Sequence, residues 1–239
     1  MASATFYGIG IGPGDPELIT LKAHRTLQRV DAVAYIVNAE GYSLAADIAR
    51  ESLPASQRQK HLKIRIEMCS ERTQINRVYD TTAEQIAELL EAGRDVAFLC
   101  EGDPLFYGSF AYLLDRLAAR YPCQVIPGIS SLQAASAAAL LPTALLTENL
   151  AVISARCTEN ELLEALARFD NLIILKGGRQ RARVKVLIEQ SGRLRDGLYL
   201  EYLSHPHERR VFDLRELPDE PGPYFSLFMV SRRHGQRPQ

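Results

Sequence analysis

Short apolar runs alternate with amphipathic segments along the chain. The runs that predict strands are residues 32–37, 61–68, 95–100, 123–128, 150–155, 171–178, 197–203 and 224–231. Helices are expected at residues 16–30, 43–53 and 81–93; in the last, Ile86, Leu89 and Leu90 share one face and Gly93 is a stop signal. This alternation predicts an α/β protein in which parallel strands are flanked by helices.

The length of 239 residues suits one large domain or two small ones. The second half is as rich in predicted strands as the first, and Tyr121 and Pro122 interrupt the pattern between them. We therefore expect an N-terminal α/β domain with Gly-rich loops at residues 1–122 and a C-terminal α/β domain at residues 123–239. Residues 142–149 are the alternative boundary.

The segment YGIGIGPGDPELIT, residues 7–20, has the order strand, glycine loop, helix, because Asp15 and Pro16 suit an N-cap and a first helical position. Its glycine spacing fits neither the dinucleotide pattern G-x-G-x-x-G nor the phosphate loop G-x-x-x-x-G-K-[ST]. Such bare backbone usually approaches a ligand closely, and the alternative is a tight turn that binds nothing.

Two further strands end in glycine-bearing loops, EGDPLFYGS at residues 101–109 and PGISS at residues 127–131. In a parallel sheet the carboxyl ends of the strands share one edge, so we expect the three loops to converge where open α/β sheets bind ligands. The alternative for residues 101–109 is a helix start, with Asp103 as the cap, Pro104 near the first turn and Phe106 in the core.

Composition limits the classes of partner. A net charge of −1 provides no overall field for nucleic acid, and no run approaches the ~18 apolar residues of a membrane span. The N-terminus lacks a secretory leader, so the expected location is the cytoplasm. Cys69, Cys100, Cys123 and Cys157 are far apart and are expected to be reduced. The pair His205 and His207 lacks further ligands, so no metal site is expected.

Three stretches, YGIGIGPGDPELIT, AGRDVAFLCEGDPLFYGSFAYLLDRLA and VIPGISS, resemble the tetrapyrrole methylases, which use S-adenosylmethionine to methylate macrocycles of the cobalamin and siroheme pathways. The resemblance runs from Phe6 to YFSLFMVSRR. The extended string LCEGDPLFYGSF is similar to the branch that methylates precorrin-2 at carbon 20. Gly177 departs from that branch, where a β-branched residue is expected, as does the loop NAEGYSLA.

The resemblance implies two α/β domains with the cofactor in the cleft between them, and a homodimer. It also implies that S-adenosylmethionine acts as methyl donor and that no metal is needed. The cofactor-binding residues that it implies are Pro13, Gly102, Asp103, Phe106, Tyr107, Ser130 and Ser131, with Lys176 and Tyr202 from the second domain. Glu101, Asp103 and Tyr107 are possible proton acceptors, and no catalytic residue is assigned.

A tetrapyrrole substrate bears many carboxylates, which need local positive charge. Lys176 and Arg179 are the expected substrate-binding residues, because arginine binds both oxygens of a carboxylate and both residues follow a strand. The basic residues Arg181, Arg183 and Lys185 are expected on a solvated helix face, and Arg209 and Arg210 are further candidates.

Several functions remain open at this point. A non-catalytic regulatory module would bind the cofactor without turnover, and a methylase of the same fold would act on another macrocycle position or on a protein or RNA group. The sequence does not distinguish a metal-free macrocycle from its cobalt form.

Overall fold

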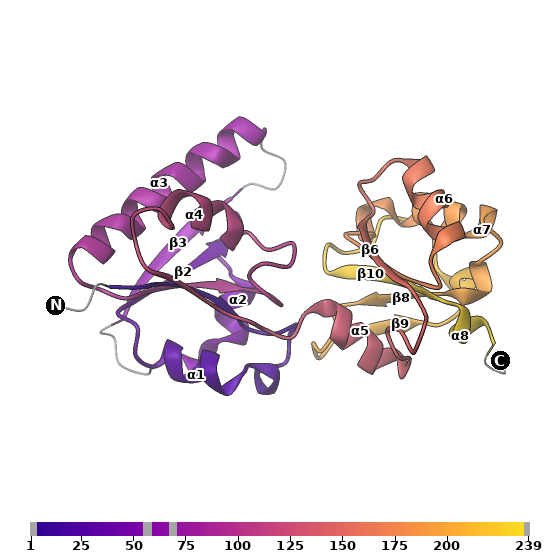
Figure 1. Ribbon diagram of the computed structural model, residues 1–239, viewed down its shortest axis with the longest axis horizontal. Coiled ribbons are helices and arrows are strands. Elements are labelled where there is room, and N and C mark those ends of the chain that lie inside the picture. Colours follow the sequence, from indigo (N-terminus) through magenta and orange to yellow (C-terminus); the bar gives the residue numbers. More distant parts are fainter. Residues whose placement is uncertain (1–3, 55–58, 67–70, 237–239) are drawn as a thin grey trace. The chain divides into compact units, whose positions relative to one another are not determined.

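The computed structural model describes residues 4–54, 59–66 and 71–236. The chain forms two compact units, Met1–Ser130 and Ser131–Gln239. Each unit contains one five-stranded sheet with helices against it (Figure 1). The α/β class expected from the alternating pattern is therefore confirmed. No helix among the described residues combines the length and the apolar character that a membrane crossing requires.

The first unit contains β1 (Phe6–Gly10), α1 (Leu21–Leu27), β2 (Ala32–Val37), α2 (Leu44–Ile48), β3 (Lys60–Arg65), α3 (Arg72–Glu91), β4 (Val96–Cys100), α4 (Phe110–Leu117) and β5 (Cys123–Ile126). Short 3-10 turns lie at Pro16–Leu18 (η1) and Arg50–Ser52 (η2). Its sheet has the order β3-β2-β4-β1-β5, and every neighbouring pair is parallel.

The pairing of β5 moves the domain boundary. Because β5 lies beside β1, with Phe6 opposite Cys123, it completes the first sheet. The units therefore divide between Ser130 and Ser131 rather than between residues 122 and 123. A break in the apolar pattern marked the end of α4 but could not reveal which sheet the next strand joins.

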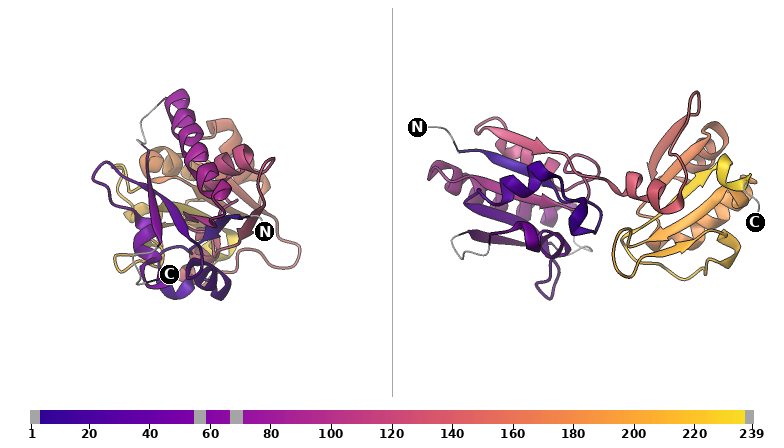
Figure 2. Two further views of the ribbon diagram at one scale, coloured as in Figure 1. Left: turned by 90° about the vertical axis from the view of Figure 1, so that its left-hand side faces the viewer. Right: turned by 90° about the horizontal axis from the view of Figure 1, so that it is seen from below.

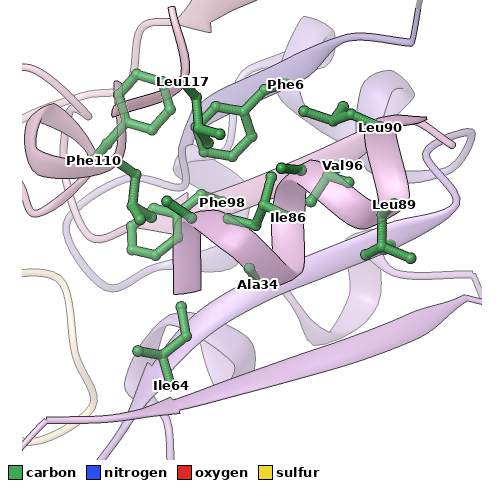
Figure 3. Close-up of a cluster of buried hydrophobic side chains, with 14 of the residues drawn as sticks. Phe6, Ala34, Ile64, Ile86, Leu89, Leu90, Val96, Phe98, Phe110 and Leu117 are labelled. Atoms are coloured by element: carbon green, nitrogen blue, oxygen red, sulfur yellow. The ribbon is translucent and has the colours of Figure 1, made fainter. Parts of the chain in front are cut away.

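The first sheet is buried on both faces. One face packs against α3 and α4 and the other against α1 and α2, and α1 lies in front of the sheet in the right-hand view of Figure 2. On the α3 side, the rings of Phe6 and Phe98 both approach that of Phe110, with centroid distances of 5.2 and 6.4 Å (Figure 3). Burial of both faces explains why these strands are continuous apolar runs.

The helices differ from their expected limits for local reasons. Asp15 accepts a hydrogen bond from the amide of Glu17, as expected of an N-cap, but it begins only η1, and α1 starts afresh with Thr20 as its own cap. The helix expected at residues 81–93 begins earlier, at Arg72. Ile75 and Val78 extend its apolar face by the i, i+3 spacing and pack against the core of the first sheet.

The second unit contains α5 (Ser131–Ala139), β6 (Leu150–Ser154), α6 (Glu159–Arg168), β7 (Asn171–Leu175), α7 (Arg181–Gln190), β8 (Gly197–Glu201), β9 (Arg209–Val211), β10 (Ser226–Ser231) and α8 (Arg232–Gly235). Its 3-10 turns are η3 (Gly178–Gln180), η4 (Leu194–Asp196) and η5 (Leu214–Glu216). The helices α6 and α7 cover one face of the sheet through a core of buried apolar side chains.

The second sheet is mixed, with the order β6-β7-β10-β8-β9, so the expectation of purely parallel strands was wrong for this unit. The strands β6 and β7 are parallel, whereas β10 runs antiparallel to both β7 and β8. A parallel return of β10 beside β8 would need a crossover, usually a helix, and only β9 and η5 lie between them. As a result β6, β7 and β8 all point the same way.

Candidate functional site

The three glycine loops of the first unit meet at one edge of its sheet, as the sequence predicts. Their strands β4, β1 and β5 are neighbours and parallel, so all three carboxyl ends lie side by side. The amide of Gly102 donates to the carbonyl oxygen of Gly12 at 2.7 Å, and Gly12 and Gly102 form an isolated bridge beyond the strands.

Glycine is required here because the loops touch each other through their backbones. A Cβ on Gly10 would lie 2.6 Å from the carbonyl oxygen of Gly102 and 2.5 Å from the amide nitrogen of Gly128. Gly12 and Gly102 also adopt left-handed backbone conformations, with φ of 82° and 69°. The absence of side chains at these glycines therefore allows the three loops to pack against each other.

Asp103 joins two of these loops. Its Oδ1 accepts from the amide of Leu105 at 2.9 Å, and its Oδ2 accepts from the amide of Gly128 at 3.2 Å. Both carboxylate oxygens are thus engaged by backbone. No helix begins at Asp103, because α4 starts only at Phe110, so the alternative of a helix cap with Pro104 in the first turn was wrong.

The loop at residues 101–109 presents two aromatic rings. Phe106 is half-buried and meets the ring of Tyr107 edge to face at 5.3 Å, so it is not a core residue. Tyr107 is 49% exposed and has φ of 55°, a left-handed conformation that costs a non-glycine residue ~1–3 kcal/mol. Strain of this kind persists where the surrounding structure imposes it, often at binding sites.

The remaining residues expected at this edge have mixed exposure. Pro13 is half-buried in the first loop, and Ser130 is buried at the end of the third. Ser131 is half-buried and opens α5, so it belongs to the second unit. Glu101 is exposed when the whole residue is considered. The protein around its carboxyl group nevertheless raises the pKa of that group by desolvation, and backbone hydrogen bonds from Glu101 and Ala45 partly oppose this rise.

In the second unit, Lys176 and Tyr202 directly follow β7 and β8 and so lie at one edge of that sheet. Both are non-glycine residues with positive φ, 60° and 49°. Burial lowers the pKa of Lys176, and the positive charge of Arg156 lowers it further. Tyr202 packs against the ring of His207 at 4.2 Å, and Arg179 is exposed in η3.

Four other basic residues that the sequence analysis named make contacts within the second unit. Arg181 is buried and pairs with Glu201 at 3.4 Å, so its expected place on a solvated face was wrong. Lys185 donates to the carbonyl oxygen of Leu217 at 2.7 Å. Arg209 pairs with Glu201 at 3.8 Å, and Arg210 donates to the carbonyl oxygen of Ala138 at 2.8 Å.

The sequence did not single out Arg156 or Arg183 for the edge of the second sheet at which Lys176 and Tyr202 lie. Arg156 had no motif of its own, and Arg183 was grouped with its basic neighbours; only the strand order shows where they lie.

Cys100 is buried and Cys123 and Cys157 are half-buried, all as free thiols, whereas Cys69 lies outside the described residues. The part of the chain that the structure describes brings no three His, Cys, Asp or Glu side chains together as a metal site.

The chain has two α/β units, and three glycine loops gather at the carboxyl edge of the parallel sheet in the first. This arrangement is typical of α/β proteins that bind a ligand at that edge. The chain belongs to the tetrapyrrole (corrin/porphyrin) methylases, a family that matches residues 5–218. This confirms the resemblance carried by the three glycine-bearing stretches.

Among characterised relatives, the precorrin-2 C(20)-methyltransferase of Sinorhizobium sp is 36% identical over 229 residues, 93% of each chain. The cobalt-precorrin-2 C(20)-methyltransferase of Salmonella typhimurium is 31% identical over 95% of this chain and 96% of that one. The cobalamin biosynthesis protein CobIJ of Mycobacterium tuberculosis is 37% identical over 96% of this chain, which spans only 46% of that longer protein.

Solved structures agree on the fold. Cobalt precorrin-4 methyltransferase, CbiF, aligns with a TM-score of 0.76 at 20% identity and covers 98% of this chain and 96% of its own. The uroporphyrin-III C-methyl transferase of Thermus thermophilus, complexed with S-adenyl homocysteine, aligns with a TM-score of 0.67 at 26% identity over 96% of this chain and 98% of its own.

Proposed function

We propose that this protein transfers a methyl group from S-adenosylmethionine to carbon 20 of precorrin-2, giving precorrin-3A in cobalamin biosynthesis. The observation that carries the proposal is the likeness, over nearly all of both chains, to two enzymes named for methylation at this carbon. The extended string LCEGDPLFYGSF supports the same position on the macrocycle. A second candidate substrate is the cobalt form, because one of the two relatives is named for it.

The glycine edge of the first unit fits S-adenosylmethionine. Phe106 with the exposed Tyr107 offers apolar surface of the kind that an adenine ring needs. The cofactor contacts that we propose in the first unit are Pro13, Gly102, Asp103, Phe106, Tyr107 and Ser130. Ser131, Lys176 and Tyr202 are those that we propose in the second.

Asp103 acts in this proposal mainly through the loops. Because both of its carboxylate oxygens accept backbone hydrogen bonds, it holds the loops after β4 and β5 in one arrangement. The cofactor, when bound, supplies a sulfonium that carries an activated methyl. The protein then has to align donor and acceptor, and a well-aligned pair gains on the order of 7–11 kcal/mol over free reactants. No covalent nucleophile is required.

The macrocycle carboxylates need cations, and Lys176 and Arg179 are our candidates for them. Both lie just after β7, and Arg179 is exposed in η3. We also expect the functional form to be a homodimer in the cytoplasm, and light scattering of the purified protein checks the dimer.

The experiment that tests the function is carbon NMR of the product made from methyl-labelled S-adenosylmethionine, with metal-free and cobalt precorrin-2 supplied separately. We expect a single label on carbon 20 with one of the two forms. A label on any other carbon would contradict the proposed position. Binding of S-adenosylhomocysteine without any methyl transfer would instead favour a regulatory, non-catalytic module.

A further inference from the structure

Two cationic residues lie next to each other at the carboxyl edge of the second sheet. Arg156 follows the end of β6 by two residues, and Lys176 follows the end of β7 by one. The strands are parallel neighbours with Ser154 opposite Leu175, and the amide of Ala155 continues the ladder by donating to the carbonyl oxygen of Leu175 at 2.8 Å. The two loops therefore leave the sheet side by side.

The backbone around Arg156 is fixed by Arg183 of α7. One guanidinium nitrogen donates to the carbonyl oxygen of Ala155 and another to that of Cys157, each at 2.8 Å. These carbonyl groups belong to the residues on either side of Arg156. The loop is thus held rigidly while Arg156 itself stays exposed. A guanidinium is well suited to such a double contact because its donors lie in one plane.

Lys176 is held in a strained position by the residues that follow it. Its left-handed φ of 60° is followed by Gly177 and Gly178. A Cβ on Gly177 would lie 2.8 Å from the ring of Phe228, and one on Gly178 would overlap the carbonyl group of Pro223. Close packing of this turn therefore fixes where Lys176 leaves the sheet. Gly177, a departure from the related branch in the sequence, is required by that contact.

Arg156 and Lys176 place two positive charges side by side at this edge. Arg156 lowers the pKa of Lys176, so the two charges repel each other. The ion pairs found among the described residues include none with Arg156. A rigid loop that holds one cation beside another suits a ligand that carries negative charge, since the ligand relieves the repulsion when it binds.

We propose that Arg156 and Lys176 together bind one carboxylate group of a ligand, with Arg183 as the positioning residue of the pair. The inference rests on the proposed function, which supplies two ligands with carboxylates. One is the tetrapyrrole with its carboxylate side chains, and the other is the aminoacyl end of S-adenosylmethionine. The planar fork of Arg156 donates a hydrogen bond to each of the two carboxylate oxygens, and Lys176 adds a point charge.

The test compares Arg156→Gln with Arg195→Gln. Arg195 is an exposed arginine in η4, just before β8, so it lies at the opposite edge of the same sheet and its loss changes the net charge equally. Two equilibrium constants are measured for each variant: binding of uroporphyrin III by fluorescence, and binding of S-adenosylhomocysteine by calorimetry. Neither measurement depends on turnover, so both remain informative if the proposed reaction is wrong.

We expect Arg156→Gln to weaken one of these ligands on the order of tenfold relative to Arg195→Gln, equivalent to about 1.4 kcal/mol. Weaker uroporphyrin III binding alone identifies a macrocycle carboxylate, and weaker S-adenosylhomocysteine binding alone identifies the aminoacyl carboxylate. If both ligands bind Arg156→Gln as tightly as Arg195→Gln, the proposal is overturned. Wild-type protein that binds uroporphyrin III through Arg156 but methylates no precorrin-2 would refute only the proposed function.

The role of Arg183 is tested by combining variants. If Arg183 acts by positioning Arg156, then Arg183→Gln weakens the same ligand in the wild-type background and adds nothing in the Arg156→Gln background. Additive losses in the double variant would remove Arg183 from the proposal. Circular dichroism and thermal melting of each variant establish that the compared proteins are folded.

Discussion

Replacement of Gly128 by alanine is expected to separate the three glycine loops and to abolish cofactor binding. A Cβ at this position would lie 2.8 Å from Cα of Gly10, where ordinary contact begins at 3.4 Å, and it would overlap the carbonyl oxygen of Gly102. Both neighbours are backbone atoms, so no side chain can rotate away. The loop after β5 has to move away from the loops after β1 and β4.

The size of the effect follows from the hydrogen bonds that this movement breaks. The bond from the Gly128 amide to Asp103 involves a charged acceptor and is worth ~1.5–3 kcal/mol. The bond from Gly102 to Gly12 joins neutral backbone groups and is worth ~0.5–1.5 kcal/mol. We therefore expect a loss of roughly 2–4.5 kcal/mol in the free energy of unfolding of the first unit.

The matched control is Gly93→Ala. Gly93 has a left-handed φ of 74° and open space where its Cβ would lie, so alanine there is strained but meets no atom. It should cost ~1–2 kcal/mol and leave cofactor binding unchanged. Urea unfolding gives the stabilities, and calorimetry with S-adenosylhomocysteine gives the affinities. If Gly128→Ala folds with wild-type affinity and loses no more stability than Gly93→Ala, the close contact of the loops is not what shapes the site.

Two further variants probe single interactions. Asp103→Asn should destabilise the first unit by ~1.5–3 kcal/mol in urea unfolding. The reason is that the side-chain amide of asparagine replaces one charged acceptor by an N–H donor that faces a backbone amide. Unchanged stability would show that these hydrogen bonds contribute little. Glu201→Gln should destabilise the second unit by ~3–5 kcal/mol, because it removes the buried carboxylate beside Arg181 and leaves that buried charge only the exposed Glu220, 3.9 Å away. Arg181→Met combined with Glu201→Gln should recover part of the loss. A double variant less stable than Glu201→Gln alone would contradict this account.

The sequence by itself determined the fold class and the position of the glycine loops. Buried strands such as β2 and β4 are read correctly because a sheet covered on both faces needs continuous apolar runs. The convergence of the three loops also followed from the sequence, since parallel strands end at one edge whatever their order. The family was identified from the same loops, because the stretches that contain them resemble those of its members.

The tertiary structure alone decided which strands are neighbours, and therefore what many polar residues do. Long-range pairing places β5 in the first sheet and returns β10 antiparallel in the second, and no local signal encodes either pairing. Asp103 reads as a ligand-binding carboxylate or a helix cap until Gly128 is seen to donate to it across the edge of the sheet. Arg181 reads as a surface charge until Glu201 is found beside it, because only the partner makes burial of a charge tolerable.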